Sequence, residues 1–499
     1  MSKLQVPEDI LIADKPVTMK RSWWRFLTLC SLLALSVITY VLLIHAVPES
    51  DDHIAPFLHV WMISFLPYFA ACAFVLATKP LDGKWRWVEL GIIVLGAFIL
   101  RVMLLPLPPG LSHDSWRYLW DARVTLHGFS PYVFAPEDKA LASLQNTILY
   151  TNSRFRNVPT IYPPGAQAAY LLSYLLVPAN LTFLKGLFVI FDMVTCIALI
   201  VLLGRKGLDQ RRVILYAWCP LPIIEFAIQG HVDVITLTFT ILAILAASYH
   251  SVRGYILTGF LIGLATLTKL YPILLLLVIL PDGNDRDAPV MQRLTYHYIP
   301  LLASCFVTII IGYTPYLILG HGQAFGFFAA YASEQGQNAG VTQQIVHWLG
   351  NRSHLPLSKT IWLEHVVDVF AIGATSVIVF VLRWRNNITV EAGALILFGV
   401  VLSISSHVFP WYTTILLLWV PVLLVPFWSN TGLVGRGLAI IAVWYFTTTV
   451  LLSYFFNPGP GIPDHWTIYY RLVYWPVMIT LGIAALIGVM NLIRFQKKV

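Results

Sequence analysis

The sequence predicts an all-α fold: a polytopic bundle of about 12–14 transmembrane helices. Only 11% of its 499 residues are charged and 58% are hydrophobic, whereas about a quarter of the residues in a soluble domain are charged. Apolar runs of about 20 residues, the length of a membrane-crossing helix, repeat almost from end to end. The short alternating segments of a membrane β-barrel are not seen. Residues 1–499 are therefore expected to form a single integral membrane domain.

Apolar runs give the positions of the crossings, and basic residues give their direction. Lys and Arg gather in the short segments between apolar runs, and such residues mark the cytoplasmic side. The pattern predicts fourteen crossings with both chain ends inside, at residues 26–46, 56–77, 87–108, 183–203, 213–230, 232–249, 254–268, 271–280, 298–319, 361–382, 391–406, 411–427, 437–456 and 470–493. The first is expected to be a transmembrane helix rather than a cleaved signal segment.

Two stretches leave the number of crossings approximate. Residues 166–178 are apolar, but a crossing there would put basic clusters on both sides, so a re-entrant or interfacial helix is expected. Residues 254–280 form either one long helix or two short ones. A break near Pro272 is expected, because proline has no N–H to donate and disfavours a helical residue before it.

This topology gathers most of the chemically versatile residues on the outer side of the membrane. The segments there are the long loops 110–164 and 320–360, the turn 229–233, Lys269, the segment 405–412 and the loop 457–469. Loops that only connect helices have little reason to collect His, Asp, Glu and Trp side chains. One extracytoplasmic site is therefore expected.

The first outer loop contains a short predicted helix. Ser112 is a plausible N-cap, Gly128 a plausible residue after the helix end, and the following Pro131 stops continuation. Between them Asp114, Arg117 and Asp121 recur at i, i+3 and i+7 and share one face.

Two interpretations of that face remain. Asp121 with Arg117 or Arg123 is equally well explained as a salt-bridged surface helix, whereas His113 and Asp114, at the start of the segment, favour function.

Several motifs then follow in a fixed order. After Asp114 come Arg117-Tyr118, Gly128-Phe-Ser-Pro-Tyr132, Ile161-Tyr-Pro-Pro164, Thr268-Lys-Leu-Tyr-Pro-Ile273 and Ser406-His-Val-Phe-Pro-Trp-Tyr412. Over residues 87–475 the chain resembles the polyprenyl-phosphate-sugar-dependent glycosyltransferases of the GT-C fold. It is most similar to the mannosyltransferase-like branches, including bacterial polyprenol-phosphate-mannose enzymes and the first mannosyltransferase of GPI-anchor synthesis. The GPI enzymes carry a DxD in this loop, where this chain has His113-Asp114-Ser115, so the use of a divalent metal stays open.

The resemblance implies a chemistry and a place for it. A sugar, such as mannose or another hexose or pentose, would pass from a polyprenyl phosphate to a lipid or glycan acceptor. The reaction would occur on the extracytoplasmic face of the cell (plasma) membrane, with no cofactor indicated and no nucleic acid as partner. Asp114 matches the family's catalytic carboxylate and would be the general base of an inverting displacement.

Lys269 is the main candidate for the donor phosphate. An ionisable residue in an apolar run is costly enough to suggest function, although a lysine near a helix end also reaches the interface by snorkelling. Secondary phosphate candidates are Arg117, Arg123 and Arg471.

Further polar and aromatic residues are candidates for substrate binding. They are His113, Asp121, Tyr162, His231, Asp233, His407, Trp411 and Tyr412, with Glu334, Gln335, Gln337 and Asn338 as a polar stretch that contacts the acceptor or is simply solvated. Tyr162 precedes two prolines and equally suits a simple helix entry. His231 and Asp233 lack the further nearby ligands that zinc requires.

Two other classes of membrane protein are alternatives. A polytopic transporter or lipid-linked glycan flippase would place polar groups near the bilayer midplane and often shows repeated halves with broken helices. This chain has one candidate break and its charges lie at the outer edge. A polymerase or ligase of lipid-linked glycans would be centred on one large outer loop rather than on an early acidic helix.

Overall fold

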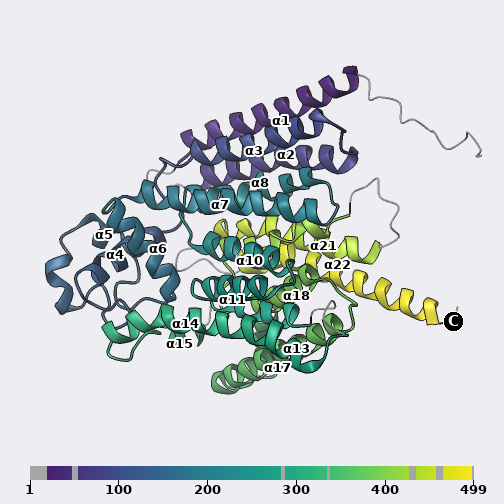
Figure 1. Ribbon diagram of the computed structural model, residues 1–499. Coiled ribbons are helices and arrows are strands. Elements are labelled where there is room, and N and C mark those ends of the chain that lie inside the picture. Colours follow the sequence, from purple (N-terminus) through teal and green to yellow (C-terminus); the bar gives the residue numbers. More distant parts are fainter. Residues whose placement is uncertain are drawn as a thin grey trace, which may run out of the picture.

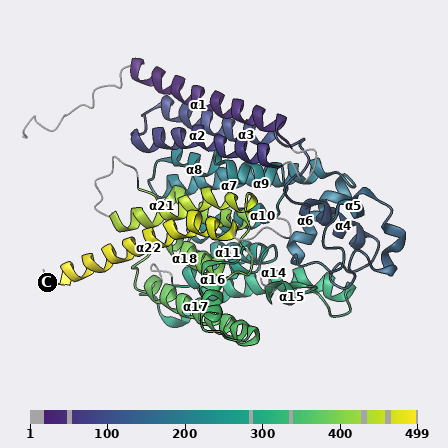
Figure 2. The same cartoon turned by 180° about the vertical axis from the view of Figure 1, so that it is seen from behind.

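The computed structural model describes residues 19–47, 54–281, 287–333, 338–425, 434–456 and 465–496. Every regular element in these ranges is helical, so the predicted all-α class is confirmed. The long helices run side by side along one direction and form an elongated bundle (Figures 1 and 2).

Seven helices are long and apolar enough to cross a membrane, counted over the described residues. They lie in α1 (Met19–His45), α2 (Ala55–Ala77), α7 (Leu181–Arg205), α13 with α14 (Val290–Arg293 and Ile299–Leu319), α17 (Leu357–Trp384), α21 with η9 (Val434–Thr449 and Val450–Tyr454) and α22 (His465–Gln496). α3 (Lys84–Val102) packs against α1 and α7. The protein is therefore a multi-pass membrane bundle.

Shorter helices fill the centre of the bundle. They are α8 (Ile214–Ala217), α9 (Pro220–Ala227), α10 (Asp233–Ala247), α11 (Val252–Thr266), η5 (Tyr271–Leu275), α12 (Leu276–Ile279), α18 (Val390–Ser403), η8 (Pro410–Thr413), α19 (Thr414–Leu417) and α20 (Val420–Leu423). Pro220, Pro272 and Pro410 stand at the first or second position of new helices, where a missing N–H is harmless. The expected break in 254–280 is therefore found, with α11 followed by two short pieces.

The loop 110–164, predicted to lie on the outer side, folds into a cap over one end of the bundle. It contains α4 (Asp114–Leu126), η3 (Lys139–Leu144) and α5 (Ile148–Asn152), and α6 (Pro164–Leu176) follows it (Figure 1). With 13 residues, α6 is about 20 Å long, too short to cross a hydrocarbon core of about 30 Å. Its first turn instead docks inside the protein, where the Gly165 N–H donates to the Leu267 carbonyl at 2.7 Å.

The second outer loop also contains helices. α15 (Phe328–Ser333) and α16 (Val341–Arg352) lie within 320–360. The predicted polar residues Glu334, Gln335 and Gln337 lie outside the described residues, as does much of the loop 457–469.

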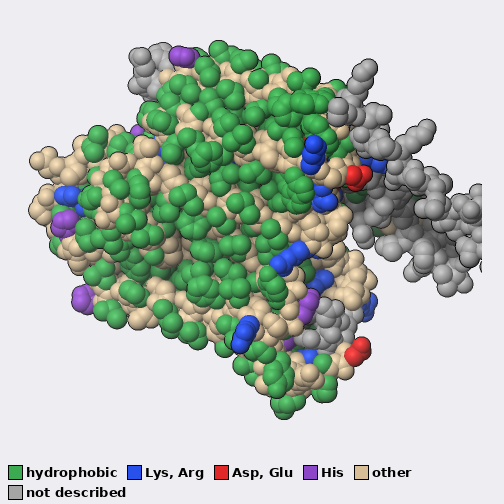
Figure 3. All heavy atoms as spheres, turned by 45° about the horizontal axis from the view of Figure 1, so that its top comes forward, with side chains coloured by type: hydrophobic (Ala, Val, Ile, Leu, Met, Phe, Trp, Pro, Cys, Tyr) green, Lys and Arg blue, Asp and Glu red, His purple; other side chains and the backbone are tan. Residues whose placement is uncertain are grey.

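The surface matches a lipid-facing bundle. Large hydrophobic side chains such as Ile310, Phe370 and Leu486 are well exposed. Figure 3 shows hydrophobic side chains over most of the visible face, with most Lys and Arg side chains toward the edge away from the α4–α6 cap.

A buried ion pair joins the helices of the core. Arg101 on α3 donates to Asp192 on α7 at 2.6 Å, and both side chains are fully buried. The Tyr216 hydroxyl on α8 donates to the other Asp192 oxygen at 2.6 Å, and Arg101 also donates to the Ala217 carbonyl. Because a charge in an apolar interior needs a partner, these contacts fix α3, α7 and α8 against one another.

Replacing Arg101 tests this pair. Arg101→Met leaves Asp192 buried without its cation, so we expect a loss of stability of about 3–5 kcal/mol. The measurement is thermal unfolding in detergent, with Arg253→Met, a change at an exposed position, as the control. Equal melting temperatures for both variants and the wild type would contradict the structural role of the pair.

Candidate active site

A cavity of about 510 Å³ lies under the cap. The first outer loop, the segments around 327–338 and 407–412, and the end of η9 contribute its wall. Its lining residues are Leu111, Ser112, His113, Asp114, Arg117, Arg154, Phe155, Val158, Pro159, Thr160, Ile161, Tyr162, Phe327, Tyr331, Asn338, His407, Phe409, Pro410, Trp411, Tyr412, Ser453 and Tyr454.

Asp114 presents a carboxylate to this cavity from the first turn of α4. The helix begins one residue later than the predicted Ser112 cap implies, and the Ser112 hydroxyl accepts a hydrogen bond from the Asp114 N–H at 3.3 Å. The side chain is 26% exposed, and the Tyr162 hydroxyl donates to Oδ2 at 3.0 Å. His113 holds the loop from the other side through its Nδ1, 3.1 Å from the Asn152 carbonyl.

The surroundings of Asp114 change its acidity. Burial raises the pKa of its carboxyl above the usual range, while the Tyr162 hydrogen bond and the charge of Lys269 act in the opposite direction. A carboxylate with a raised pKa is a better base near neutral pH.

Lys269 lies behind two tyrosines of the cavity wall. Its ammonium is 3.3 Å from Asp233 Oδ1, and the Lys269 side chain is 17% exposed. It lies 4.5 Å from the centre of the Tyr412 ring and 5.8 Å from that of Tyr162. The side chain therefore points to an internal carboxylate and two aromatic faces. It does not line the cavity directly.

The turn between α9 and α10 connects the core to the first loop. Gln229 Oε1 accepts hydrogen bonds from the Leu111 and Ser112 N–H groups, at 3.0 and 3.2 Å. Gly230 adopts a left-handed φ of 71°, and a Cβ there would lie 2.9 Å from the Lys185 side chain and 3.2 Å from that of Ser115. The turn is thus fixed directly beside Asp114.

His231 follows in this turn and is completely buried. Its ring stacks on Trp411, with centroids 3.7 Å apart and planes at 10°. Nδ1 lies 3.8 Å from Asp114 Oδ2, and Nε2 lies 3.3 Å from Oε2 of Glu225. Burial lowers the pKa of His231 well below its usual range, and Lys269 acts in the same direction, so the imidazole is neutral.

Stacked rings form one wall of the cavity. His407, Phe409 and Trp411 lie nearly parallel, with successive centroids 5.6 and 4.6 Å apart. Tyr331 stacks on His407, and its hydroxyl is 2.9 Å from that of Tyr412. The sequence predicted His407, Trp411 and Tyr412 but missed Phe409 and Tyr331. The alternation at 407, 409 and 411 was a usable signal for Phe409, since alternate residues of an extended segment share a face.

The structure gives Arg117 and Asp121 structural partners. Arg117 bonds Asp121 at 2.8 Å and donates to the carbonyls of Phe155 and Val158 at 2.9 and 3.0 Å. Asp121 also accepts from Gln167 at 3.1 Å. The bonds to Phe155 and Val158 hold the later part of the loop 110–164 against α4. Arg117 also lines the cavity.

The other predicted arginines lie away from the cavity. Arg123 donates to the Tyr174 hydroxyl at 3.2 Å, and Arg471 is exposed on α22; neither lines the cavity. Arg154 and Tyr454, which also line the cavity, were missed as well. Within the described residues, no group of three or more His, Cys, Asp or Glu has the arrangement of a metal site.

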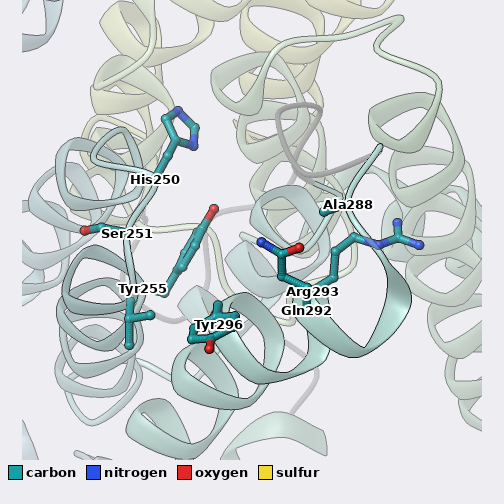
Figure 4. A pocket seen from close by; sticks show the side chains of 8 residues that line it. His250, Ser251, Tyr255, Ala288, Gln292, Arg293 and Tyr296 are labelled. Atoms are coloured by element: carbon teal, nitrogen blue, oxygen red, sulfur yellow. The ribbon is translucent and has the colours of Figure 1, made fainter.

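A second, smaller pocket of about 230 Å³ lies at the far ends of α10 and α11. Figure 4 shows His250 and Tyr255 on one side, and Gln292 and Arg293 on another. The described residues that line it include no carboxylate. The larger cavity is therefore the candidate active site.

Residues 160–410 match the family described as glycosyltransferase family 87. No curated protein matches the sequence. The matched region includes the turn with His231, Lys269 and part of the aromatic wall, whereas Asp114 precedes it.

Gly230 provides a test of the fixed turn. Gly230→Ala is expected to destabilise the protein by about 1–2 kcal/mol, because an L residue is strained at positive φ and its Cβ meets Lys185. Gly399→Ala on α18, where a Cβ has open space, is the matched control. Thermal unfolding in detergent compares the two variants. A Gly230→Ala protein as stable as the control would show that the turn tolerates rearrangement.

Proposed function

Because the chain belongs to glycosyltransferase family 87, we propose that it transfers a sugar from a polyprenyl phosphate to a lipid or glycan acceptor. Family membership makes the protein a sugar-transferring membrane enzyme. We further propose that the sugar is mannose, another hexose or a pentose. One observation supports the proposal most directly. The Asp114 carboxylate faces the cavity, and the Lys269 ammonium lies behind Tyr162 and Tyr412 of the same cavity wall.

Lys269 would bind the donor phosphate. A monophosphate leaving group needs only one or two cations to stabilise its developing charge. The Lys269 ammonium lies 3.3 Å from Asp233 Oδ1 and faces the rings of Tyr412 and Tyr162, which line the cavity. Arg154, in the cavity lining, offers a second cation.

Asp114 would act as the general base. In the proposed step it takes the proton of the acceptor hydroxyl as the acceptor oxygen bonds to the anomeric carbon. The bond from that carbon to the phosphate oxygen breaks, and its electron pair leaves with the phosphate. A single displacement inverts the anomeric configuration, and the stacked rings give the sugar an apolar surface to lie against.

The reaction would occur on the extracytoplasmic face of the cell membrane. The C-terminal end of α7 lies at the bundle end opposite the α4–α6 cap (Figure 1). Arg205 and Lys206 stand at that end of the helix, and basic residues favour the cytoplasmic side. The capped cavity would then face outward. A cavity at one end of the bundle suits a transferase better than a transporter or flippase, which binds cargo near the midplane.

Asp114→Asn tests the proposed base. We expect kcat for transfer from a radiolabelled polyprenyl-phosphate sugar to fall by about 10²–10⁴, with donor KM little changed. Glu137→Gln is the control, because Glu137 is an exposed carboxylate of the same loop outside the cavity. Unchanged transfer by Asp114→Asn would eliminate Asp114 as the base. Wild-type uptake of a substrate into vesicles without any transfer would favour the transporter.

Lys269→Met tests the phosphate contact. Losing a charged contact of about 1.5–3 kcal/mol should raise donor KM by about 10- to 150-fold. Because Lys269 lowers the pKa of Asp114, its loss raises that pKa. The acidic limb of the kcat profile therefore moves to higher pH. Lys359→Met, at an exposed position on α17, serves as the control, and wild-type kinetics for Lys269→Met would contradict the assignment.

A further inference from the structure

Glu225 is a second carboxyl close to the proposed base. It lies on α9 and is completely buried. Its Oε1 accepts a hydrogen bond from the Tyr454 hydroxyl at 3.1 Å, and its Oε2 lies 3.3 Å from Nε2 of His231. Nδ1 of the same ring lies 3.8 Å from Asp114 Oδ2. The imidazole therefore bridges a buried carboxyl and one that faces the cavity.

The two carboxyl groups differ in what surrounds them. Asp114 is 26% exposed, whereas Glu225 is 0% exposed. In the described part of the chain, no Lys or Arg forms an ion pair with Glu225. A buried carboxylate without a cation is costly, so Glu225 retains its proton. A protonated Glu225 would present its O–H to Nε2 of His231, 3.3 Å away, and the imidazole N–H would then stand at Nδ1, on the side of Asp114.

We propose that Glu225 and His231 are positioning residues for Asp114. Glu225 fixes the tautomer of the neutral imidazole, and His231 directs its Nδ1–H at Oδ2 of Asp114. This inference rests on the proposed function, in which Asp114 is the base. Tyr162 donates to Oδ2, and Nδ1 of His231 lies 3.8 Å from the same oxygen, which is longer than a hydrogen bond. In the proposed complex this contact shortens when substrate binds, and the other oxygen is left to receive the proton of the acceptor hydroxyl.

The surroundings of His231 hold its ring in this orientation. The His231 N–H donates to the Glu225 carbonyl at 3.0 Å, so the same residue fixes the backbone and the side chain. Trp411 covers one ring face, and the left-handed Gly230 sets the direction in which the chain enters the turn. Rotation of the ring would require several of these contacts to break.

The titratable and charged groups around the imidazole come from separate elements. They are Asp114 on α4, Glu225 on α9, Asp233 on α10, Lys269 after α11 and Tyr454 on η9. A hydrogen bond to a carboxylate favours its ionised form. Losing the Nδ1–H donor therefore raises the pKa of Asp114. As the pH falls, the base is then protonated, and activity lost, at a higher pH than in the wild type.

Two substitutions of Glu225 separate this role from simple packing. Leu cannot donate to His231, so Glu225→Leu is expected to lower kcat at least about tenfold, to leave donor KM within about twofold and to move the acidic limb to higher pH. The amide of Gln donates to Nε2 and accepts from Tyr454 as the protonated carboxyl does. Glu225→Gln is therefore expected to recover at least about a third of wild-type kcat, with the wild-type acidic limb.

The results distinguish this inference from the proposed function. A folded Glu225→Gln protein whose kcat is at least about tenfold below wild type would overturn the protonated donor, whether or not the Leu variant folds. Wild-type kcat and pH profile in Glu225→Leu would overturn the positioning role while Asp114→Asn stays inactive. Full activity of Asp114→Asn would instead reject the proposed base.

Discussion

Charged groups inside an apolar bundle are stable only when they are paired, and this constraint organises the protein. The Arg101–Asp192 pair joins α3 to α7, and Glu89 lies between Arg25 and Arg211, which joins α1, α3 and η4 (Gln210–Val213). These pairs are fully enclosed. The Lys269–Asp233 pair obeys the same rule but remains partly exposed behind the cavity wall. A charge that had to be paired for stability is thereby kept where the proposed donor phosphate would bind.

The site is built where helices are interrupted. Pro220, Pro272 and Pro410 each lie in the first turn of a short helix, and Pro410 lines the cavity. Polar side chains and turns therefore occur at places where a continuous helix would present only its apolar face. Irregular backbone is tolerated in a membrane protein when it is buried in the protein or lines a cavity. The first turn of α6, docked on the Leu267 carbonyl, brings Tyr162 to the same place.

Much of this architecture could be predicted from sequence. Hydropathy indicates the helical class and the approximate positions of the long apolar helices, because a helix must be long and apolar to cross lipid. The break near Pro272 follows from proline chemistry. Asp114, Tyr162, His231 and Trp411 could be singled out as polar or aromatic residues in outer segments.

Other features depend on packing between distant segments. Glu225 lies within an apolar run and carries no periodic signal, and its role appears only when His231 and Tyr454 meet it. The sequence leaves the role of Arg117 undecided, because its hydrogen bonds to the carbonyls of Phe155 and Val158 form only once the loop has folded back onto α4. The direction in which Arg471 points depends on how α22 packs, which its composition does not encode.

The central claim is that Asp114 and Lys269 act on opposite sides of the bond that breaks. Cryo-electron microscopy of the protein in lipid nanodiscs with a bound polyprenyl-phosphate sugar tests it most directly. The account predicts the phosphate against Lys269, near Tyr162 and Tyr412, with the anomeric carbon facing Asp114. A phosphate bound away from Lys269, or a sugar bound with Asp114 outside its contacts, would contradict it.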